Sequence, residues 1–337
     1  MWAIRRHFPS AHLALLSDVH ENNNYVLARS ILPQQALFDQ WLAYPARYEG
    51  SSPRGMAKLL FELRRHRFDT LVYLAPRRRT PFQIRRDLLF FYSAGIRTFI
   101  GHREFKPLPK KVFDNPIPSL QHEADHLLHR LSLDGIPIPP PGRGEMNLTL
   151  TETERSEAHA WLLEHCGEEL RLGGLAGIGP GSKWPSKVWP AERFAELGRH
   201  LIKEFGLFPV VFGGCEDSEL AERLIAEWGQ GINAAGLLTI RQAAAALSCC
   251  RLYVGNDTGT MHLAAAVGTP CVAVFSAQDY PGRWYPYGNG HVVLRESVPC
   301  EACLLKKCDR DMECLKRIGV ERMLDACRSI CEKAVTA

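Results

Sequence analysis

One stretch, residues 252–275, constrains the fold of this chain more than any other; it reads LYVGNDTGTMHLAAAVGTPCVAVF. It opens with a short apolar run that breaks at Gly255, continues as an alanine-rich segment over 260–267, and ends in a second apolar run at 271–275. Short β-prone runs that flank a helix-prone segment predict a strand–helix–strand unit whose strands are buried on both faces. Such a unit belongs to a parallel α/β sheet.

The helix of this unit is expected to begin at residues 258–260, beside the carboxyl end of the first strand. Backbone N–H groups and the positive end of the helix dipole can receive an anion there, and Gly259 lets a phosphate approach the backbone. Asp257 and His262 flank this point. A plainer alternative is that Asp257 caps the helix and His262 is a partly buried helix residue. The residues of this stretch alone leave both alternatives open.

Length and composition allow two globular domains and disfavour several functional classes. Of 337 residues, 46% are hydrophobic and 23% are charged, which is an ordinary globular balance. The net charge of +4 is too small to predict a nucleic-acid partner, but it is compatible with anionic substrates or an anionic membrane surface. The sequence shows neither a bilayer-spanning apolar run nor a signal peptide. We therefore expect a cytoplasmic protein whose eleven cysteines stay mostly reduced.

Strand-like and helix-like segments alternate through residues 1–169, which we expect to form an N-terminal α/β domain. The expected strands are 12–16, 70–74 and 98–100, and the expected helices are 1–8, 25–32, 56–65, 82–93 and 123–133. The chain opens with what reads as the end of a helix, whereas an α/β domain usually begins with a buried strand. We therefore expect that the domain lacks its first strand. Either the true start lies upstream of Met1, or the chain is a truncated and inactive descendant.

Arginines and aromatic residues gather around the helix expected at 82–93. The arginines are Arg77, Arg78, Arg79, Arg85 and Arg86, and the aromatic residues are Phe82, Phe90, Phe91 and Tyr92. A solvated helix face explains this pattern. The alternative is a docking surface for an anionic, lipid-linked acceptor.

The character of the sequence changes after residue 167, and we place a second domain at 170–337. An apolar, glycine-rich strand at 173–179 leads into the loop GPGSKWPSKVWP, which ends at a proline in the first helical position. A further strand is expected at 209–212, with helices at 191–205, 217–228 and 239–248. Because ligands of doubly wound sheets bind at the carboxyl ends of strands, three loops should line one rim. These loops are 179–187, 213–217 and 255–262.

Three segments in this second domain together resemble one enzyme family. They are GPGSKWPSKVWPAERFAEL, FGGCEDSELAERL and NDTGTMHLAAAVGTPCVAVF. They resemble glycosyltransferase family 9, the ADP-heptose:lipopolysaccharide heptosyltransferases and their relatives, most strongly over residues 177–282. The resemblance implies an α/β fold of the GT-B class, in which two Rossmann-like domains face a cleft and the C-terminal domain holds the nucleotide-sugar.

The same resemblance implies a set of donor-binding residues. Lys187 would pair with the donor's diphosphate as a point charge, and Glu216 or its neighbour Asp217 would hold the ribose hydroxyls. For Lys187 and Lys183 a solvated loop lysine is the plainer alternative. The whole implied set is Ser182, Lys183, Lys187, Glu216, Asp257, Thr258, Gly259 and His262.

The reaction implied by the resemblance is inverting sugar transfer without a required cofactor. It would move a heptose from ADP-heptose to a lipopolysaccharide-core or related glycolipid acceptor, at or near the cytoplasmic face of the inner membrane. The family's base is an aspartate in a Gly-Asp loop, expected upstream of Met1, so no catalytic residue is assigned. Two other classes stay open. One is a non-catalytic nucleotide-sugar-binding protein, and the other is a GT-B sugar-nucleotide epimerase.

Four cysteines near the C-terminus follow the spacing C-x2-C-x4-C-x5-C. They are Cys300, Cys303, Cys308 and Cys314. Four thiolates could hold a structural zinc ion. Reduced thiols in a compact loop and disulfides are the alternatives. Because sugar transfer by the GT-B fold needs no metal, no metal ligand is assigned.

Overall fold

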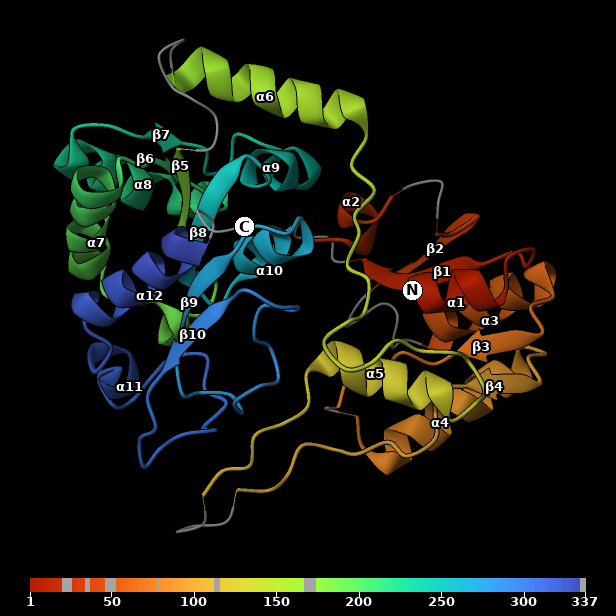
Figure 1. The fold of residues 1–337 in the computed structure, drawn as a ribbon. Coiled ribbons are helices and arrows are strands. Elements are labelled where there is room, and N and C mark those ends of the chain that lie inside the picture. The colour runs from red at the N-terminus through yellow and green to blue at the C-terminus, as the bar shows by residue number, and fades with distance from the viewer. Residues whose placement is uncertain are drawn as a thin grey trace. The chain divides into compact units, whose positions relative to one another are not determined.

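The computed structural model describes residues 1–19, 26–33, 37–45, 53–77, 79–111, 116–166 and 174–333. The chain divides into two compact units, the first formed by residues 1–113 and 123–145, the second by residues 114–122 and 146–337. In Figure 1 the first unit runs from red to yellow, and most of the second runs from green to blue. Both units alternate helices and strands, as the sequence predicted.

Two parallel strand pairs form the centre of the first unit. β1 (Ala14–Val19) pairs with β2 (Gln40–Pro45), and β3 (Thr70–Val72) pairs with β4 (Thr98–Ile100). The helices are α1 (Trp2–His7), α2 (Ala28–Ile31), α3 (Pro53–His66), α4 (Pro81–Ser93) and α5 (Glu123–Ser132). Within the described residues no sheet joins the two pairs. The strand expected upstream of Met1 stays a prediction.

Apolar side chains cover the strands of the first unit in two clusters. Leu63 of α3 packs with Leu42 of β2 in one cluster. Ile4 of α1 packs with Ile100 of β4 and Leu131 of α5 in the other. The helix predicted over residues 56–65 therefore supplies part of this core through one apolar face.

The predicted cluster of arginines and aromatic residues around α4 divides into buried and exposed members. Arg77 is 5% exposed and pairs with Glu123, with Nε 3.3 Å from Oε2. Phe90 and Phe91 pack against the core, whereas Phe82 and Tyr92 are exposed. Arg78 lies outside the described residues. The prediction that all these residues lie on one solvated helix face is therefore wrong for Arg77, Phe90 and Phe91.

The second unit is a doubly wound sheet of six parallel strands in the order β10-β9-β8-β5-β6-β7. Its strands are β5 (Leu175–Gly179), β6 (Phe208–Val211), β7 (Ile232–Asn233), β8 (Cys250–Asn256), β9 (Cys271–Phe275) and β10 (Val292–Arg295). This is the Rossmann strand order, and it reverses between β5 and β8. The predicted strand–helix–strand unit is confirmed as β8, α10 (Gly259–Ala266) and β9.

Helices cover both faces of this sheet (Figure 1). They are α6 (Glu152–Cys166), α7 (Ala191–Phe205), α8 (Ser218–Trp228), α9 (Ile240–Leu247), α10, α11 (Glu313–Lys316) and α12 (Val320–Lys333). Val254 of β8 packs into the cluster that contains residues of α7, α8 and α12. Its neighbour Tyr253 packs into the cluster that contains residues of α9 and α10. Alternate side chains are thus buried on opposite faces, as expected for a parallel strand.

The first helix of the second unit, α6, lies within residues 1–169, which were predicted to form the N-terminal domain. Arg241 of α9 donates to Glu154 of α6, with Nε 2.5 Å from Oε1, and to the carbonyl oxygens of Leu148 and Thr149. The hydrogen bonding between the Glu154 carboxylate and the Arg241 guanidinium is the main reason that the pKa of Glu154 falls to about 2. The main part of the second unit consequently includes α6 and begins at residue 146, earlier than the boundary predicted after residue 169.

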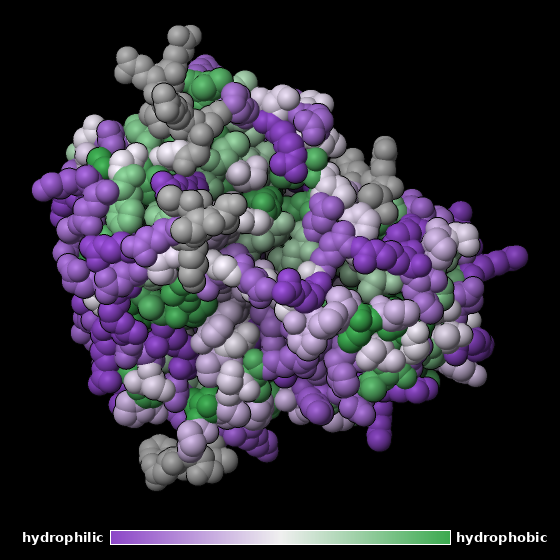
Figure 2. Space-filling view, viewed as in Figure 1, coloured by the Kyte–Doolittle hydropathy of each residue, from purple (hydrophilic) through white to green (hydrophobic). Residues whose placement is uncertain are grey.

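The described surface offers no membrane-spanning helix, since none is both long and apolar enough to cross a bilayer. In the face shown in Figure 2, hydrophilic residues predominate on each unit and hydrophobic residues form smaller, separate patches. On such a surface, several exposed apolar side chains in a row along a single helix would need a specific explanation.

Candidate functional site

Two of the loops predicted to line one rim follow β5 and β8, which are adjacent strands on either side of the switch point. The loop after β5 contains a 3-10 turn, Pro185–Lys187, and Asp257 directly follows β8. Ligands of doubly wound sheets bind outside the carboxyl ends of the strands at such a point. The candidate site is built here.

An ion pair joins these two loops. Lys187 Nζ lies 2.5 Å from Asp257 Oδ2, and the side chains are 17% and 6% exposed. The ammonium also lies over the ring of Trp184, 5.5 Å from its centroid. Because both charges are largely withdrawn from water, each offsets the desolvation cost of the other. An incoming anion at this point would share Lys187 with Asp257.

Asn256, the last residue of β8, fixes the loop that carries Lys187. It is completely buried. Its Nδ2 donates to the carbonyl oxygen of Pro180 at 2.7 Å, and its Oδ1 accepts from the backbone N–H of Trp189 at 3.0 Å. Both ends of the loop are therefore tied to the end of β8. Sequence reasoning missed this role, although the position of Asn256 before Asp257 is the signal that could have found it.

The loop is supported from its other side by the C-terminal segment that contains the cysteines. Ser186 Oγ donates to the carbonyl oxygen of Leu305 at 2.7 Å, and Trp189 Nε1 donates to that of Ile318 at 3.0 Å. Trp189 is fully buried. These bonds hold Lys187 in place without using its side chain.

Glycines allow the two strand ends to approach α10. A Cβ on Gly179 would lie 1.8 Å from the Tyr253 hydroxyl, and one on Gly255 would lie 2.5 Å from it. That hydroxyl is hydrogen-bonded to Thr260 Oγ1 at 2.8 Å. Any larger residue at either glycine would push Tyr253, and with it the start of α10, out of place.

The N-terminus of α10 is open to a ligand. Its N-cap is Thr258, whose hydroxyl makes no capping hydrogen bond, so the alternative that Asp257 caps the helix is wrong. Gly259 is exposed, and no heavy atom lies within 4 Å of the position that a Cβ would take. An anion could therefore reach the backbone N–H groups of the first turn, where the helix dipole favours negative charge.

His262 lies one turn into α10 and is held as a neutral imidazole. Its ring packs edge-on against Trp284, with centroids 6.5 Å apart. Burial lowers the pKa of His262 most; Asp257 raises it, and His122 and Lys187 lower it further. At neutral pH it can therefore give or accept a hydrogen bond but carries no charge. The alternative of a partly buried helix residue stays open.

A segment from the first half of the chain also contributes to this region. Leu120 N donates to the carbonyl oxygen of Pro281 at 2.8 Å, and His122 Nε2 lies 3.0 Å from that of Tyr285. The His122 ring lies 4.7 Å from that of Tyr287. Nothing in the local sequence signals this packing, because it depends on contacts across more than 160 positions.

Glu216 and its neighbour Asp217 differ in exposure and in their hydrogen bonds. Asp217 is half-buried, its Oδ2 accepts the N–H of Gly214 at 3.0 Å, and burial raises its pKa. A Cβ on Gly181 would lie 1.9 Å from Asp217 Oδ1, so this carboxylate packs between the first two rim loops. Glu216 is exposed. Of the two carboxylates, Glu216 is the one that a ligand can reach.

Ser182 and Lys183 lie on the same loop as Lys187 but are less tightly held. Ser182 Oγ accepts the backbone N–H of Trp184 at 3.2 Å. Lys183 is exposed and close enough to Asp217 to lower the pKa of that carboxyl. Lys187 is thus fixed by its ion pair with Asp257, whereas Lys183 lies at the surface.

The sequence model of glycosyltransferase family 9 (heptosyltransferase) matches residues 138–313, slightly more than half of the chain. This range contains all eight of the predicted donor-binding residues. This chain belongs to glycosyltransferase family 9. The resemblance noted from the three sequence segments is confirmed.

Individual family members match this chain over different shares of its length. Lipopolysaccharide heptosyltransferase 2 of Salmonella typhimurium is 37% identical over 116 residues, which is 32% of each chain. The match therefore spans about a third of that relative's length. A family 9 glycosyltransferase of Veillonella parvula has a similar structure, with a TM-score of 0.72 at 21% identity, covering 98% of this chain and 91% of that one.

The structure of the Escherichia coli ADP-heptose lipopolysaccharide heptosyltransferase II is also similar, with a TM-score of 0.64 at 20% identity, covering 99% and 93% of the two chains. At such identities the likeness shows the fold. The predicted GT-B class of α/β fold is confirmed.

The cysteines of this family 9 chain do not form a metal site among the described residues, where no group of three or more His, Cys, Asp or Glu could hold a metal ion. All eleven cysteines are free thiols. Cys314 Sγ accepts the N–H of Ala277 at 3.4 Å, and Cys308 Sγ accepts those of Arg310 and Met312. These contacts are those of thiols in a compact loop; a structural zinc ion and disulfides stay alternatives.

Proposed function

We propose that this family 9 chain is an inverting glycosyltransferase that moves a heptose from ADP-heptose to a lipopolysaccharide-core or related cell-envelope acceptor. The observation that carries the proposal is the Lys187–Asp257 pair beside the open N-terminus of α10. Family membership and the names of the similar heptosyltransferases support the choice of sugar.

The chemistry of the leaving group explains why these parts belong together. As the anomeric carbon is attacked, negative charge grows on the departing diphosphate, so hydrogen-bond donors and positive charge fixed there lower the barrier. Lys187 would supply a point charge, and the first turn of α10 would supply N–H groups and its dipole. Asp257 would hold Lys187 in position and contact the sugar.

The other predicted residues take supporting roles in this proposal. Glu216 would accept hydrogen bonds from the ribose hydroxyls, since Asp217 is committed to the Gly214 N–H. Thr258 and His262 would hydrogen-bond the diphosphate or sugar as neutral groups, with Ser182 and Lys183 at the margin. No cofactor is included, and no described residue is assigned as the base.

The proposed acceptor is a glycolipid or its precursor. The proposal accordingly includes a cytoplasmic enzyme that works in contact with the inner membrane. It includes no nucleic-acid partner.

A panel of nucleotide-sugars tests the donor half of the proposal. We expect ADP-heptose and ADP to raise the melting temperature and UDP- and GDP-sugars to leave it unchanged. Transfer is then followed by mass spectrometry with a heptose-deficient lipopolysaccharide acceptor. A nucleotide-sugar-binding protein would bind ADP-heptose without turnover, and an epimerase would change the donor without acceptor. No stabilisation by any nucleotide-sugar would overturn the proposal.

A further inference from the structure

α4 carries a row of exposed apolar side chains on its solvent side. Phe82 is 75% exposed, Leu89 is 69% exposed and Tyr92 is 51% exposed. Their spacing of seven and three positions places them on one face of the helix. Ile84, which lies on the opposite face, is buried. α4 is therefore apolar on both faces, unlike an ordinary surface helix.

The row stands out among the described residues. Nine large hydrophobic side chains are exposed there, and three of them are these residues of α4. A fourth, Phe61, is 66% exposed and belongs to α3. The two helices are joined where the Arg64 guanidinium of α3 donates to the carbonyl oxygen of Ser93 at 2.9 Å. Scattered single exposures need no explanation, but a row on one helix does.

Positive charge borders the row. Arg85 and Arg86 lie between Phe82 and Leu89 on the same face of α4 and are both exposed. At the end of the row, the Arg97 guanidinium lies over the Tyr92 ring, 4.2 Å from its centroid. Together α3 and α4 contain six Arg or Lys residues and two carboxylates.

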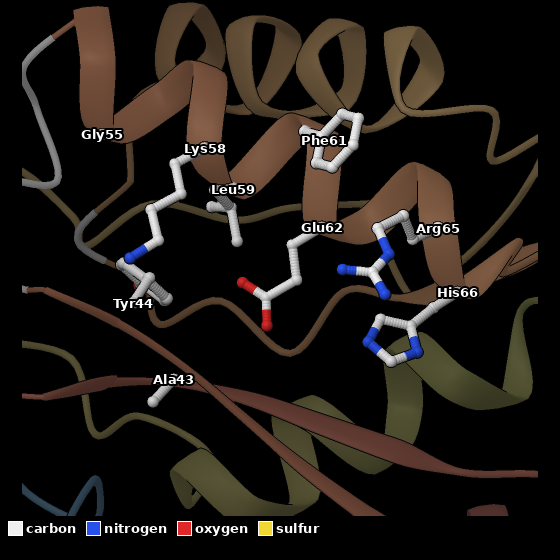
Figure 3. A pocket seen from close by; sticks show the side chains of 9 residues that line it. All are labelled: Ala43, Tyr44, Gly55, Lys58, Leu59, Phe61, Glu62, Arg65 and His66. Carbon is white, nitrogen blue, oxygen red and sulfur yellow. The ribbon is translucent and has the colours of Figure 1, made fainter.

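Of the two carboxylates, only Asp87 offsets part of the positive charge of this face. Asp87 of α4 is 15% exposed as a side chain and accepts from the Tyr73 hydroxyl at 2.9 Å. Its Oδ1 also lies 2.8 Å from Nη2 of Arg86, with which it forms an ion pair. Glu62 of α3 points toward β2, into a pocket of about 660 Å³ that it shares with Lys58 and Arg65 (Figure 3). Acidic groups are thus directed away from the apolar row.

This combination fits one kind of partner. Aromatic and aliphatic side chains beside arginines enter the boundary between lipid headgroups and acyl chains, while the guanidinium groups contact lipid phosphates. Anionic phospholipid supplies both the apolar layer and the complementary charge. α4 also begins after the carboxyl end of β3, the end at which Rossmann-like sheets bind ligands. Contact with lipid here would bring a membrane-held acceptor to that end of the first unit.

We propose that the exposed face of α4, formed by Phe82, Arg85, Arg86, Leu89 and Tyr92, docks on the surface of an anionic phospholipid bilayer. The contact is interfacial, because no described helix can span a bilayer. It extends the proposed function by naming the docking surface. Binding itself requires neither donor nor acceptor.

Flotation with vesicles tests the docking surface directly. Wild-type protein should float with vesicles of phosphatidylcholine and phosphatidylglycerol and stay unbound with phosphatidylcholine alone. The double variant Phe82→Ser/Leu89→Ser should bind the anionic vesicles about tenfold or more weakly, since each side chain loses buried apolar area. Arg85→Glu should weaken binding by a similar factor, and wild-type binding should fall as salt is raised.

Matched controls come from the second unit. Leu237 is 64% exposed, and Arg223 is exposed on α8, so Leu237→Ser and Arg223→Glu should bind as wild type does. Melting temperatures and ADP-heptose binding should be unchanged in all variants, which separates a failure here from a failure of the proposed function. No binding of wild-type protein to anionic vesicles, equal losses in the controls, or a change of oligomeric state in place of vesicle binding would each overturn the proposal.

Discussion

Lys187 and Asp257 are 70 positions apart in the chain, yet Lys187 Nζ approaches Asp257 Oδ2 to 2.5 Å. The sheet explains the approach, because β5 and β8 are neighbours at the point where the strand order reverses. Asn256 then clamps both ends of the intervening loop. The lysine is therefore positioned before any ligand arrives, which reduces the entropy lost when an anion binds.

The first prediction concerns removal of this cation. Lys187→Ala should weaken ADP-heptose binding by about 1–3 kcal/mol, the range for a charge-assisted hydrogen bond at a partly buried site. Part of that cost would arise because Asp257 then repels the diphosphate. The double variant Lys187→Ala/Asp257→Asn should consequently bind ADP, which has no sugar for Asp257 to contact, better than Lys187→Ala alone.

Isothermal titration calorimetry with ADP and ADP-heptose measures both effects. The matched control is Lys183→Ala, which removes an exposed lysine from the same loop and should cost less than Lys187→Ala. If Lys187→Ala bound ADP-heptose as wild type does, the proposed site would be wrong.

The second prediction separates binding from stability at the start of α10. Gly259→Ala should leave the melting temperature unchanged or slightly raised, because the new methyl group meets open space and alanine favours helix. It should weaken ADP-heptose binding about tenfold or more, since the methyl group would occupy the place of a phosphate. Gly319→Ala is the control, because Gly319 also has open space around its Cβ position. Tight ADP-heptose binding by Gly259→Ala would show that the diphosphate lies elsewhere.

Much of the second unit could be predicted because its signals are local. Alternation of apolar runs with helix-like segments gave the bounds of α7 and β9 as the structure has them. The helix predicted at 239–248 is present as α9, where the N-cap Thr239 forms a capping box and its hydroxyl accepts the Gln242 N–H at 3.3 Å. The proximity of Lys187 and Asp257 followed from the rule that carboxyl ends of parallel strands share one edge.

Features that rest on distant contacts could not be predicted. The bonds of Asn256 to Pro180 and Trp189 depend on which strands are neighbours, and periodicity does not give strand order. The contact of the His122 ring nitrogen with the carbonyl oxygen of Tyr285 likewise has no local signature. The short strand β7 contains two residues, too few for a pattern of alternation to be visible.

The third prediction tests the clamp made by Asn256. Asn256→Asp preserves the shape but removes the donor to Pro180 and places a carboxylate in a fully buried position. The second unit should lose about 2–4 kcal/mol of stability, because an unmatched buried charge adds to the lost hydrogen bond. Urea unfolding measures this loss. Asn289→Asp, at an exposed position, should behave as wild type, and equal stability of the two variants would contradict the clamp.

The fourth prediction uses His126 of α5 in the first unit, which is 2% exposed and whose Nε2 has no hydrogen-bond partner in the described structure. Burial lowers its pKa to about 4; Arg77, Arg130 and His129 lower it too, and Glu123 opposes them. The folded state therefore binds this proton less readily than the unfolded chain, whose histidine pKa is 6.5. The resulting stability is complete above pH 6.5 and is lost as pH falls toward 4, by roughly 3 kcal/mol in total.

Hydrogen exchange over α5 follows this loss without requiring the two units to unfold together. Between pH 7.5 and pH 5, the free energy of opening of α5 in wild-type protein should fall by about 2 kcal/mol. His126→Gln, which cannot take up a proton, should lose much less over the same range. His159→Gln removes an exposed histidine from α6 and should keep the wild-type pH dependence over α5. The same fall in wild-type protein and His126→Gln would assign the acid sensitivity of this unit to another group.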